Sequence, residues 1–316
     1  MKLRVPRGLT SDDALAIVAP ASPPGRYVVA ADGTRSFDDT ELRRGLAWLY
    51  PQFRLVADSE LLLREGYLAG NDAARTRAFA RAIRDPRTRG LLAARGGYGA
   101  MRILDQIPWD AIVSDPKWLV GFSDITALQL AALSNGVASI HGPNATSLAH
   151  ARPYDRFLVS AFLRGRTFAR KWNCAELLPT RAGHVSGTVV GGNLTLIHAM
   201  AAAGRLALPE KSILLLEDVT ERPYRIDRML TALRLSGAIE KVAAIVFGSF
   251  TDCTPGPDGI TIPVVLSAFA NDVAAAKIPI VFGAPFGHGS VNEAFIQGEV
   301  ATLEGGALTL SGVVGS

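Results

Sequence analysis

One serine stands where a buried strand passes directly into a helix, and this junction most constrains how the chain can fold. Residues 118–126 read WLVGFSDIT. The apolar start predicts the end of a buried strand, and Ile125, Leu128 and Ala132 then recur at helical spacing. Such a turn holds the Ser123 hydroxyl out of the sheet, beside the first N–H groups of the helix. That geometry suits an acyl-transfer nucleophile; the alternative is that Ser123 only caps the helix.

The first half of the chain alternates predicted strands and helices. Glycine and proline punctuate it, as in the RGGYG loop at 95–99. The alternation predicts an α/β fold, with a parallel sheet wound on both faces by helices. Sites in such sheets form beyond the carboxyl ends of the strands, where both the glycine loop and Ser123 fall.

The second half mixes its signals. A helix is predicted from Pro223 to before Gly237, and the turn at 304–306 predicts a hairpin. We therefore expect three parts. They are a domain at residues 1–150 that carries the nucleophile, a polar connection at 151–183, and a smaller β-rich α+β domain at 184–316.

Composition narrows the classes of partner and compartment. The 316 residues carry a net charge of +4, with no basic block interleaved with aromatics, so nucleic-acid binding is not expected. No apolar run reaches the roughly 18 residues of a membrane helix, and no signal segment is recognisable. The two cysteines, Cys174 and Cys253, lack metal-ligand spacing and are expected to be free thiols. These features predict a cytoplasmic protein with no membrane partner.

An acidic residue in the second half is a candidate for the same chemistry as Ser123. Glu217 directly follows the apolar run 213–216, so its carboxylate is desolvated unless another group pairs with it. The alternative is a salt bridge to Arg222 or Arg225. Asp218, next in sequence, is expected to be the exposed acid of the two.

A histidine offers a general base. His288 lies within GAPFGHGS at 283–290, where flanking glycines leave the imidazole accessible, after a predicted strand. His141 is the second choice. Serine, acid and histidine in this chain order can form a triad, because the order is set by the fold and not by the chemistry. Ile125 stands where the Gly-x-Ser-x-Gly motif needs glycine, which disfavours an ordinary α/β-hydrolase.

With these residues in place, the chain resembles the serine LD-carboxypeptidases, the muramoyltetrapeptide carboxypeptidase family. The likeness extends from about residue 16 to residue 312. The motifs that carry it occur in order: RGGYG at 95–99, GFSD at 121–124, GGNL at 191–194, LED at 216–218 and GH at 287–288. The resemblance implies a flavodoxin-like N-terminal domain and a C-terminal domain of the swivelling β/β/α type, with the site assembled across the domain interface.

The resemblance also implies roles for individual residues. Ser123 is expected to be the nucleophile, His288 the general base and Glu217 the acid that orients it. The backbone N–H groups of Gly97 and Asp124 are expected to hold the oxyanion. No metal or organic cofactor is required.

The implied substrate is a cytoplasmic murein tetrapeptide from cell-wall recycling. The bond cut joins the L-centre of the diamino acid to the terminal D-alanine. Tyr98, Asn193 and Arg225 are the expected substrate contacts, with Arg225 a candidate for the free carboxylate. A homodimer is suggested by the resemblance alone.

Two other functions remain open at the sequence level. A hydrolase of the microcin-immunity type would share the three catalytic residues and add an aromatic side chain that stacks on a purine, for which Trp172 is the candidate. A binding protein without turnover would keep Ser123 and His288 apart and bridge Glu217 to an arginine.

Overall fold

The structure, a computed structural model, describes residues 3–29, 32, 34–178 and 184–315. It divides into two compact units. The N-terminal unit is Arg4–Arg166, and the C-terminal unit is Thr167–Ser316 together with Met1–Leu3. Over the described residues, no helix combines the length and the apolar character needed to span a bilayer.

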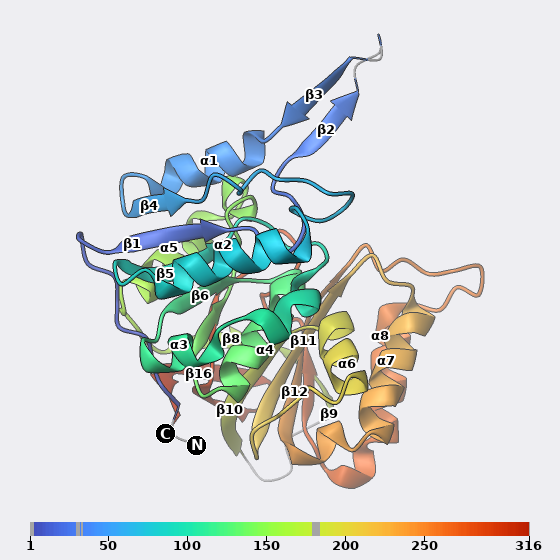
Figure 1. The fold of residues 1–316 in the computed structure, drawn as a ribbon. Helices are drawn as coiled ribbons and strands as arrows, with labels where there is room; N and C mark the ends of the chain where they lie inside the picture. The colour runs from blue at the N-terminus through green and yellow to red at the C-terminus, as the bar shows by residue number, and fades with distance from the viewer. Residues whose placement is uncertain (1–2, 30–31, 33, 179–183, 316) are drawn as a thin grey trace. The chain divides into compact units, whose positions relative to one another are not determined.

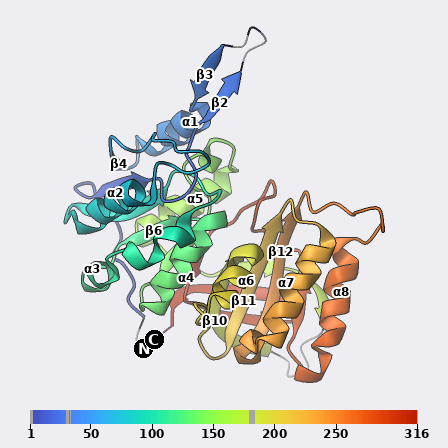
Figure 2. The same ribbon diagram turned by 45° about the vertical axis from the view of Figure 1, so that its right-hand side comes forward.

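The N-terminal unit alternates strands with helices, as the sequence predicts (Figure 1). Its elements are β1 (Ala14–Val18), β2 (Arg26–Val29), β3 (Arg35–Asp38), α1 (Thr40–Leu49), β4 (Arg54–Ala57), α2 (Asp72–Arg84), β5 (Thr88–Ala93), η1 (Ala100–Gln106), α3 (Trp109–Ser114), β6 (Trp118–Gly121), η2 (Ser123–Ile125), α4 (Thr126–Ser134), β7 (Ser139–His141), η3 (Ser147–Ala149) and α5 (Pro153–Leu163). The β2–β3 hairpin projects away from α1 and the sheet (Figure 2).

The sheet of the N-terminal unit has the flavodoxin order. The strands that this unit contributes run β4-β1-β5-β6-β7, and every pair among them is parallel. Counted along the chain without the hairpin, this is the order 2-1-3-4-5 of doubly wound sheets. All residues of β1 and of β6 are buried, because both faces of the sheet are covered. The predicted fold class is confirmed.

Local signals explain the helices around this sheet. Asn71 caps α2, and its side chain accepts a hydrogen bond from the Ala74 N–H at 2.9 Å. The glycine loop at 95–99 leads into η1, a 3₁₀ helix, whose first residue follows Gly99 at φ +125°.

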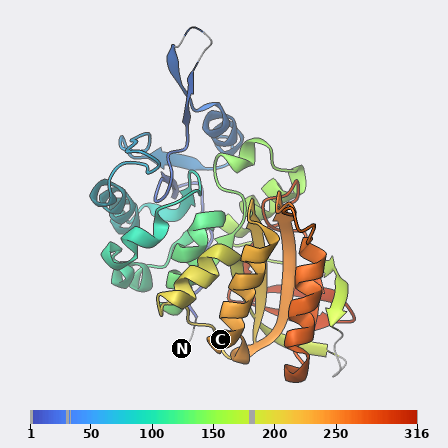
Figure 3. The ribbon, with the colours of Figure 1, turned by 90° about the vertical axis from the view of Figure 1, so that its right-hand side faces the viewer.

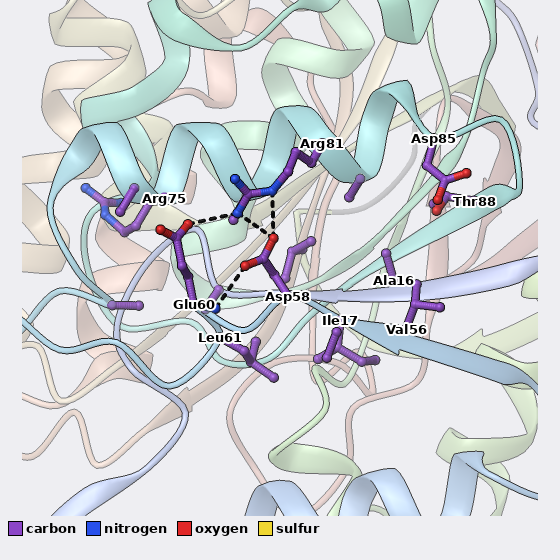
Figure 4. Close-up of a pocket in the computed structure, with 17 residues that line it drawn as sticks. Ala16, Ile17, Val56, Asp58, Glu60, Leu61, Arg75, Arg81, Asp85 and Thr88 are labelled. Atoms are coloured by element: carbon purple, nitrogen blue, oxygen red, sulfur yellow. Dashed lines mark hydrogen bonds and ion pairs between the residues drawn. The ribbon is translucent and has the colours of Figure 1, made fainter.

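A cavity of about 160 Å³ lies between α2 and strands β1 and β4 (Figure 4). Small side chains on α2, such as Ala78, leave this space open. Arg81 reaches from α2 to the carboxylates of Asp58 and Glu60 beside the cavity. None of the site residues predicted from the sequence lines it.

Residues 151–183, predicted as a connection, contain regular structure. Helix α5 belongs to the N-terminal unit, where the Leu9 N–H donates to the Leu163 carbonyl at 2.7 Å. Strands β8 (Arg170–Asn173) and β9 (Ala175–Leu178) join the sheet of the C-terminal unit. The units divide between Arg166 and Thr167. The last part of the segment, 179–183, lies outside the described residues.

The C-terminal unit is built on one eight-stranded mixed sheet. Its remaining elements are β10 (His184–Asn193), α6 (Leu194–Ala202), β11 (Ser212–Val219), α7 (Pro223–Leu235), η4 (Ala238–Lys241), β12 (Val242–Thr251), α8 (Ile262–Asp272), η5 (Ala274–Ala276), β13 (Ile280–Phe282), β14 (Phe295–Gln297), β15 (Glu299–Glu304) and β16 (Ala307–Val314). The predicted hairpin is present, with Glu304 paired to Ala307 across the turn.

The strand order of this sheet explains how its two faces are filled. It runs β8-β16-β15-β10-β11-β12-β13-β9, and β10 to β13 are parallel in chain order. Right-handed crossovers therefore place α6, α7 and α8 on one face, side by side in Figure 3. Side chains of the antiparallel strands join the core of buried residues, among them Trp172, Leu303 and Leu310.

Candidate active site

The Ser123 turn is tight and held in an unusual backbone conformation. Strand β6 ends at Gly121, where an added Cβ would lie 2.9 Å from Ile125 Cγ2. Ser123 has φ +63°, a left-handed value that is strained for a residue with a side chain. Neither η2 nor α4 has a side-chain capping bond, so the alternative that Ser123 merely caps the helix is not supported.

The glycine loop, defined as residues 95–99, packs directly on this serine. A Cβ on Gly96 would lie 2.8 Å from Ser123 Cβ and 3.1 Å from its Oγ, so only glycine fits there. Ser22 ties the loop to the end of β1: its N–H donates to the Gly96 carbonyl, and its Oγ accepts from the Tyr98 N–H at 3.1 Å. Loop and serine thus form one unit of backbone structure. The sequence marks Ser22 only as a turn residue.

Asp124 contributes a buried carboxyl group that the sequence reasoning did not use. Its Oδ2 accepts a hydrogen bond from the Ala100 N–H at 2.7 Å, and the residue is 2% exposed. Burial raises the pKa of this carboxyl to about 6. The prediction for Asp124 concerned its backbone N–H; its side chain connects the Ser123 turn to η1.

In the C-terminal unit, Glu217 and His288 form a direct hydrogen bond. His288 Nδ1 lies 2.6 Å from Glu217 Oε2, and Glu217 is fully buried on β11. Gly287, at φ +121°, allows the approach: a Cβ there would come within 2.9 Å of the same oxygen. Two of the three predicted catalytic residues, 71 positions apart in sequence, are thus brought together.

The loop that carries His288 is held by one side chain from β12 and by one of its own. The Gly289 N–H donates to Ser249 Oγ on β12 at 3.3 Å, and the Gly287 N–H donates to Asn292 Oδ1 at 3.2 Å. No motif in the sequence pointed to Ser249, because its role depends on β12 lying beside β11.

The alternative of a salt bridge from Glu217 to Arg222 or Arg225 is wrong. Arg222 donates to the Thr254 and Pro255 carbonyls, and Arg225 pairs with Glu221 at 3.3 Å.

The expectation that Asp218 is exposed is also wrong: it is 2% exposed, and burial raises the pKa of its carboxyl to about 6. It accepts hydrogen bonds from Thr195 N, Thr195 Oγ1, Val219 N and Asn193 Nδ2. These donors compensate the buried oxygens. Asp218 thereby ties the start of α6 to β11.

The three predicted substrate contacts have different surroundings. Tyr98 is 51% exposed and its ring meets Tyr67 edge-on. Arg225 is also exposed, on α7. Asn193 is 3% exposed; its Oδ1 accepts from Leu196 N at 3.2 Å, and its amide donates to the two neighbouring acids. The fold therefore uses both ends of this amide.

Trp172, the candidate for purine stacking, is a core residue. It is 2% exposed and stacks on Phe286 with ring centroids 5.8 Å apart, and its indole N–H donates to Glu293 at 2.8 Å. A buried ring cannot present a face to a nucleotide. His141 is also buried, at the end of β7.

Comparison with known proteins identifies the family. Residues 15–142 match the family model of the LD-carboxypeptidase N-terminal domain, and residues 186–303 match that of the LD-carboxypeptidase C-terminal domain. The chain belongs to the LD-carboxypeptidase family. The resemblance seen in the sequence is confirmed, and the protein is a hydrolase of the carboxypeptidase class.

Relatives in this family cover most of the chain. A Synechocystis sp. protein named as a carboxypeptidase is 35% identical over 92% of this chain and 95% of its own. The murein tetrapeptide carboxypeptidase of Pseudomonas aeruginosa is 35% identical over 78% of this chain and 82% of its own.

Two solved structures have the same fold. The muramoyltetrapeptide carboxypeptidase of Oxalobacter formigenes matches with a TM-score of 0.80 at 28% identity, over 96% of this chain and 100% of its own. The microcin immunity protein MccF, solved with glutamyl sulfamoyl guanosine, matches with a TM-score of 0.79 at 19% identity over 99% of both chains. At that identity the second likeness concerns the fold alone.

Proposed function

We propose that this LD-carboxypeptidase is a serine enzyme that releases the terminal D-alanine of murein tetrapeptides during cytoplasmic cell-wall recycling. The 2.6 Å hydrogen bond between His288 Nδ1 and Glu217 Oε2 is the observation that carries the proposal. A carboxylate on Nδ1 fixes the tautomer in which Nε2 is the basic nitrogen, and it stabilises the imidazolium that forms during acyl transfer. The murein tetrapeptide carboxypeptidase among the relatives supports the substrate.

Acylation begins at Ser123. His288 Nε2 takes the hydroxyl proton while Oγ bonds to the scissile carbonyl carbon. The carbonyl oxygen becomes an oxyanion, which the backbone N–H groups of Gly97 and Asp124 stabilise. The C–N bond then breaks, and the imidazolium gives its proton to the departing amine of D-alanine.

Deacylation repeats the same steps with water. His288 takes a proton from water as the oxygen attacks the acyl-enzyme, and then returns it to Ser123 Oγ. The products of this step are the shortened peptide and the free enzyme. The left-handed backbone at Ser123 supports this role, because such strain is typical of a nucleophile presented at a strand-to-helix turn.

Tyr98 and Arg225 remain the proposed substrate contacts, since both side chains are exposed. Asn193 acts on the substrate indirectly, by holding the Glu217 carboxylate from the other side at 3.4 Å. A homodimer remains a prediction from the family resemblance.

The deciding experiment compares muropeptides with a tetrapeptide and a pentapeptide stem. We expect D-alanine release from the tetrapeptide only, with Ser123→Ala lowering kcat by at least about 10⁴-fold. Ser134→Ala, on the adjacent helix α4, is the matched control and keeps full activity. A fluorophosphonate probe should label the wild type and not the Ser123 variant.

Because the fold is also that of MccF, the same assay should include an aminoacyl adenylate as a second class of substrate. Turnover of an aminoacyl adenylate without release of D-alanine would replace the murein substrate by a nucleotide conjugate. Absence of both activities, with no fluorophosphonate labelling, would instead favour a binding protein. The buried position of Trp172 favours the murein peptide, because this ring cannot stack on a purine.

A further inference from the structure

Two buried side chains hold the two ends of one peptide group, the group that joins Gly99 to Ala100. Arg75 Nη1 donates to the Gly99 carbonyl at 2.8 Å. Asp124 Oδ2 accepts from the Ala100 N–H at 2.7 Å. That carbonyl and that N–H belong to the same planar unit, so both its position and its orientation are fixed. We call this arrangement the peptide clamp.

Each side of the clamp is anchored in the fold. Arg75 lies on α2, is 2% exposed, and also donates to the Pro20 carbonyl just beyond β1 and to Asp72. Asp124 lies in the turn after β6 and is equally buried. The clamp therefore joins the end of the glycine loop, which follows β5, to the ends of β1 and β6 on either side of β5 and to α2.

Ser22 holds the middle of the glycine loop, and the clamp adds a restraint at its C-terminal end. Gly97 and Gly99 adopt φ values of +103° and +125°, which glycine reaches readily, and glycine has the most backbone freedom to lose on ordering. The loop lies against Ser123: a Cβ added to Gly96 would lie 2.8 Å from Ser123 Cβ. Small rotations at these glycines would displace the Gly97 N–H from a developing oxyanion.

Burial of Arg75 and Asp124 is not expected to add much to the stability of the fold. Removing an arginine and a carboxylate from water is costly, and buried ionic groups often contribute little net stability. Burial disfavours the charged form of Asp124, as its raised pKa of about 6 shows. What these groups supply is the position and orientation of one peptide group.

We propose that Arg75 and Asp124 are positioning residues that fix the Gly99–Ala100 peptide and, through it, aim the Gly97 N–H at the oxyanion formed on attack by Ser123. The inference rests on the proposed function. The clamp needs an acceptor at position 124 rather than a negative charge, and it needs the forked donor of arginine at position 75.

Steady-state kinetics on the tetrapeptide test the role. Asp124→Ala should lower kcat roughly 10- to 100-fold while KM changes less than about 3-fold, because a misplaced oxyanion donor acts on the transition state. Asp124→Asn keeps an oxygen that can accept from Ala100, so its kcat should stay at least about 10-fold above that of the alanine variant. Asp155→Asn, which alters another buried carboxylate on α5, is the control for general destabilisation.

Arginine 75 is tested separately, because its loss can disturb folding. Arg75→Lys keeps the charge but loses the planar fork in which Nη2 pairs with Asp72 while Nη1 donates to the Pro20 and Gly99 carbonyls. We expect a kcat loss similar to that of Asp124→Ala, with little further loss when both substitutions are combined. Additive losses in the double variant would show that the two side chains act independently, and would overturn the clamp.

Hydrogen exchange at the Ala100 amide gives a readout that does not depend on turnover. Asp124→Ala should raise its exchange rate by about 10-fold or more, and Asp124→Asn should raise it less. An active wild type whose Asp124→Ala variant is equally active overturns the positioning role alone. An inactive wild type overturns the proposed function and this role with it, whereas the exchange result still reports whether the contact exists.

Discussion

The carboxyl strand ends of the two units hold the proposed catalytic side chains in opposite ways. In the N-terminal unit, the turn at Ser123 is shaped by backbone: a left-handed φ of +63° and a glycine packed at 2.8 Å from its Cβ. In the C-terminal unit, His288 is positioned by a side chain, the Glu217 carboxylate at 2.6 Å. The first arrangement depends on the missing side chain of Gly96, and the second depends on the carboxylate of Glu217.

The difference predicts how each region tolerates substitution. A backbone-built turn should be most sensitive to added volume, even a methyl group, whereas a hydrogen-bonded pair should be most sensitive to isosteric changes of charge. The predictions below test this contrast, beginning with the largest expected effect.

Glu217→Gln should give the largest loss, on the order of 10⁴-fold in kcat. The side chain keeps its volume, but an amide no longer stabilises the imidazolium of His288 and can favour the wrong tautomer. The tetrapeptide assay at pH 7.5 measures it, with Glu304→Gln in the β15–β16 hairpin as control. A loss below about 10-fold would remove the carboxylate from the mechanism.

Gly96→Ala should come next, with kcat lowered by about 100-fold or more. The added methyl group would lie 3.1 Å from Ser123 Oγ and closer still to its Cβ, so either the serine or the loop must shift. Gly256→Ala is the matched control, because a Cβ there meets Asp258 Oδ1 at an ordinary 3.5 Å. Equal activity of both variants would show that the turn is not sterically tuned.

Local signals made parts of both regions predictable from sequence. The strand-to-helix junction at 118–126 follows from the spacing of apolar residues, and the caps at Asn71 and the hairpin at 304–307 follow from residue type. The pairing of Glu217 with His288 came only through the family resemblance. No local pattern spans the 71 residues between them.

What the sequence could not predict depends on tertiary neighbours. Asp218 looked exposed because it follows another acid, yet α6 supplies the donors that allow its burial. No sequence motif singles out Arg75 on α2, because its hydrogen bond goes to a carbonyl 24 residues away. Residues 151–183 looked like a connection because short edge strands carry little periodicity.

The stability of the N-terminal unit should depend on the charge of Asp124. Its pKa is raised to about 6 when folded and is near 3.8 when unfolded, so the folded state binds the proton more tightly. Ionisation therefore costs stability above pH 6, on the order of 3 kcal/mol, and the cost disappears as pH falls from 6 toward 4.

Denaturant unfolding of wild type and Asp124→Asn across pH 4–8 measures this cost. The variant should be the more stable protein at pH 8, and the difference should shrink toward pH 4, where the wild-type carboxyl is protonated. The Ser123 turn would then keep a carboxylate that reduces stability. If the stability of the wild type relative to the variant instead increased as pH rises, the folded state would favour the ionised Asp124 carboxylate. That result would contradict the raised pKa.

Asn193→Ala should have the smallest effect, and it decides whether this residue belongs to the substrate or to the fold. The substitution removes the cap of α6 at Leu196 N and a 3.0 Å donor to Asp218, which together predict a loss of about 1–2 kcal/mol in unfolding free energy. Because the same amide donates to Glu217 at 3.4 Å, kcat should fall more than KM rises. Thermal melting and steady-state kinetics on one preparation separate the two readings. A KM increase above about 10-fold with an unchanged melting temperature would make Asn193 a substrate contact after all, and the C-terminal site would then be shaped by its ligand as well as by its own hydrogen bonds.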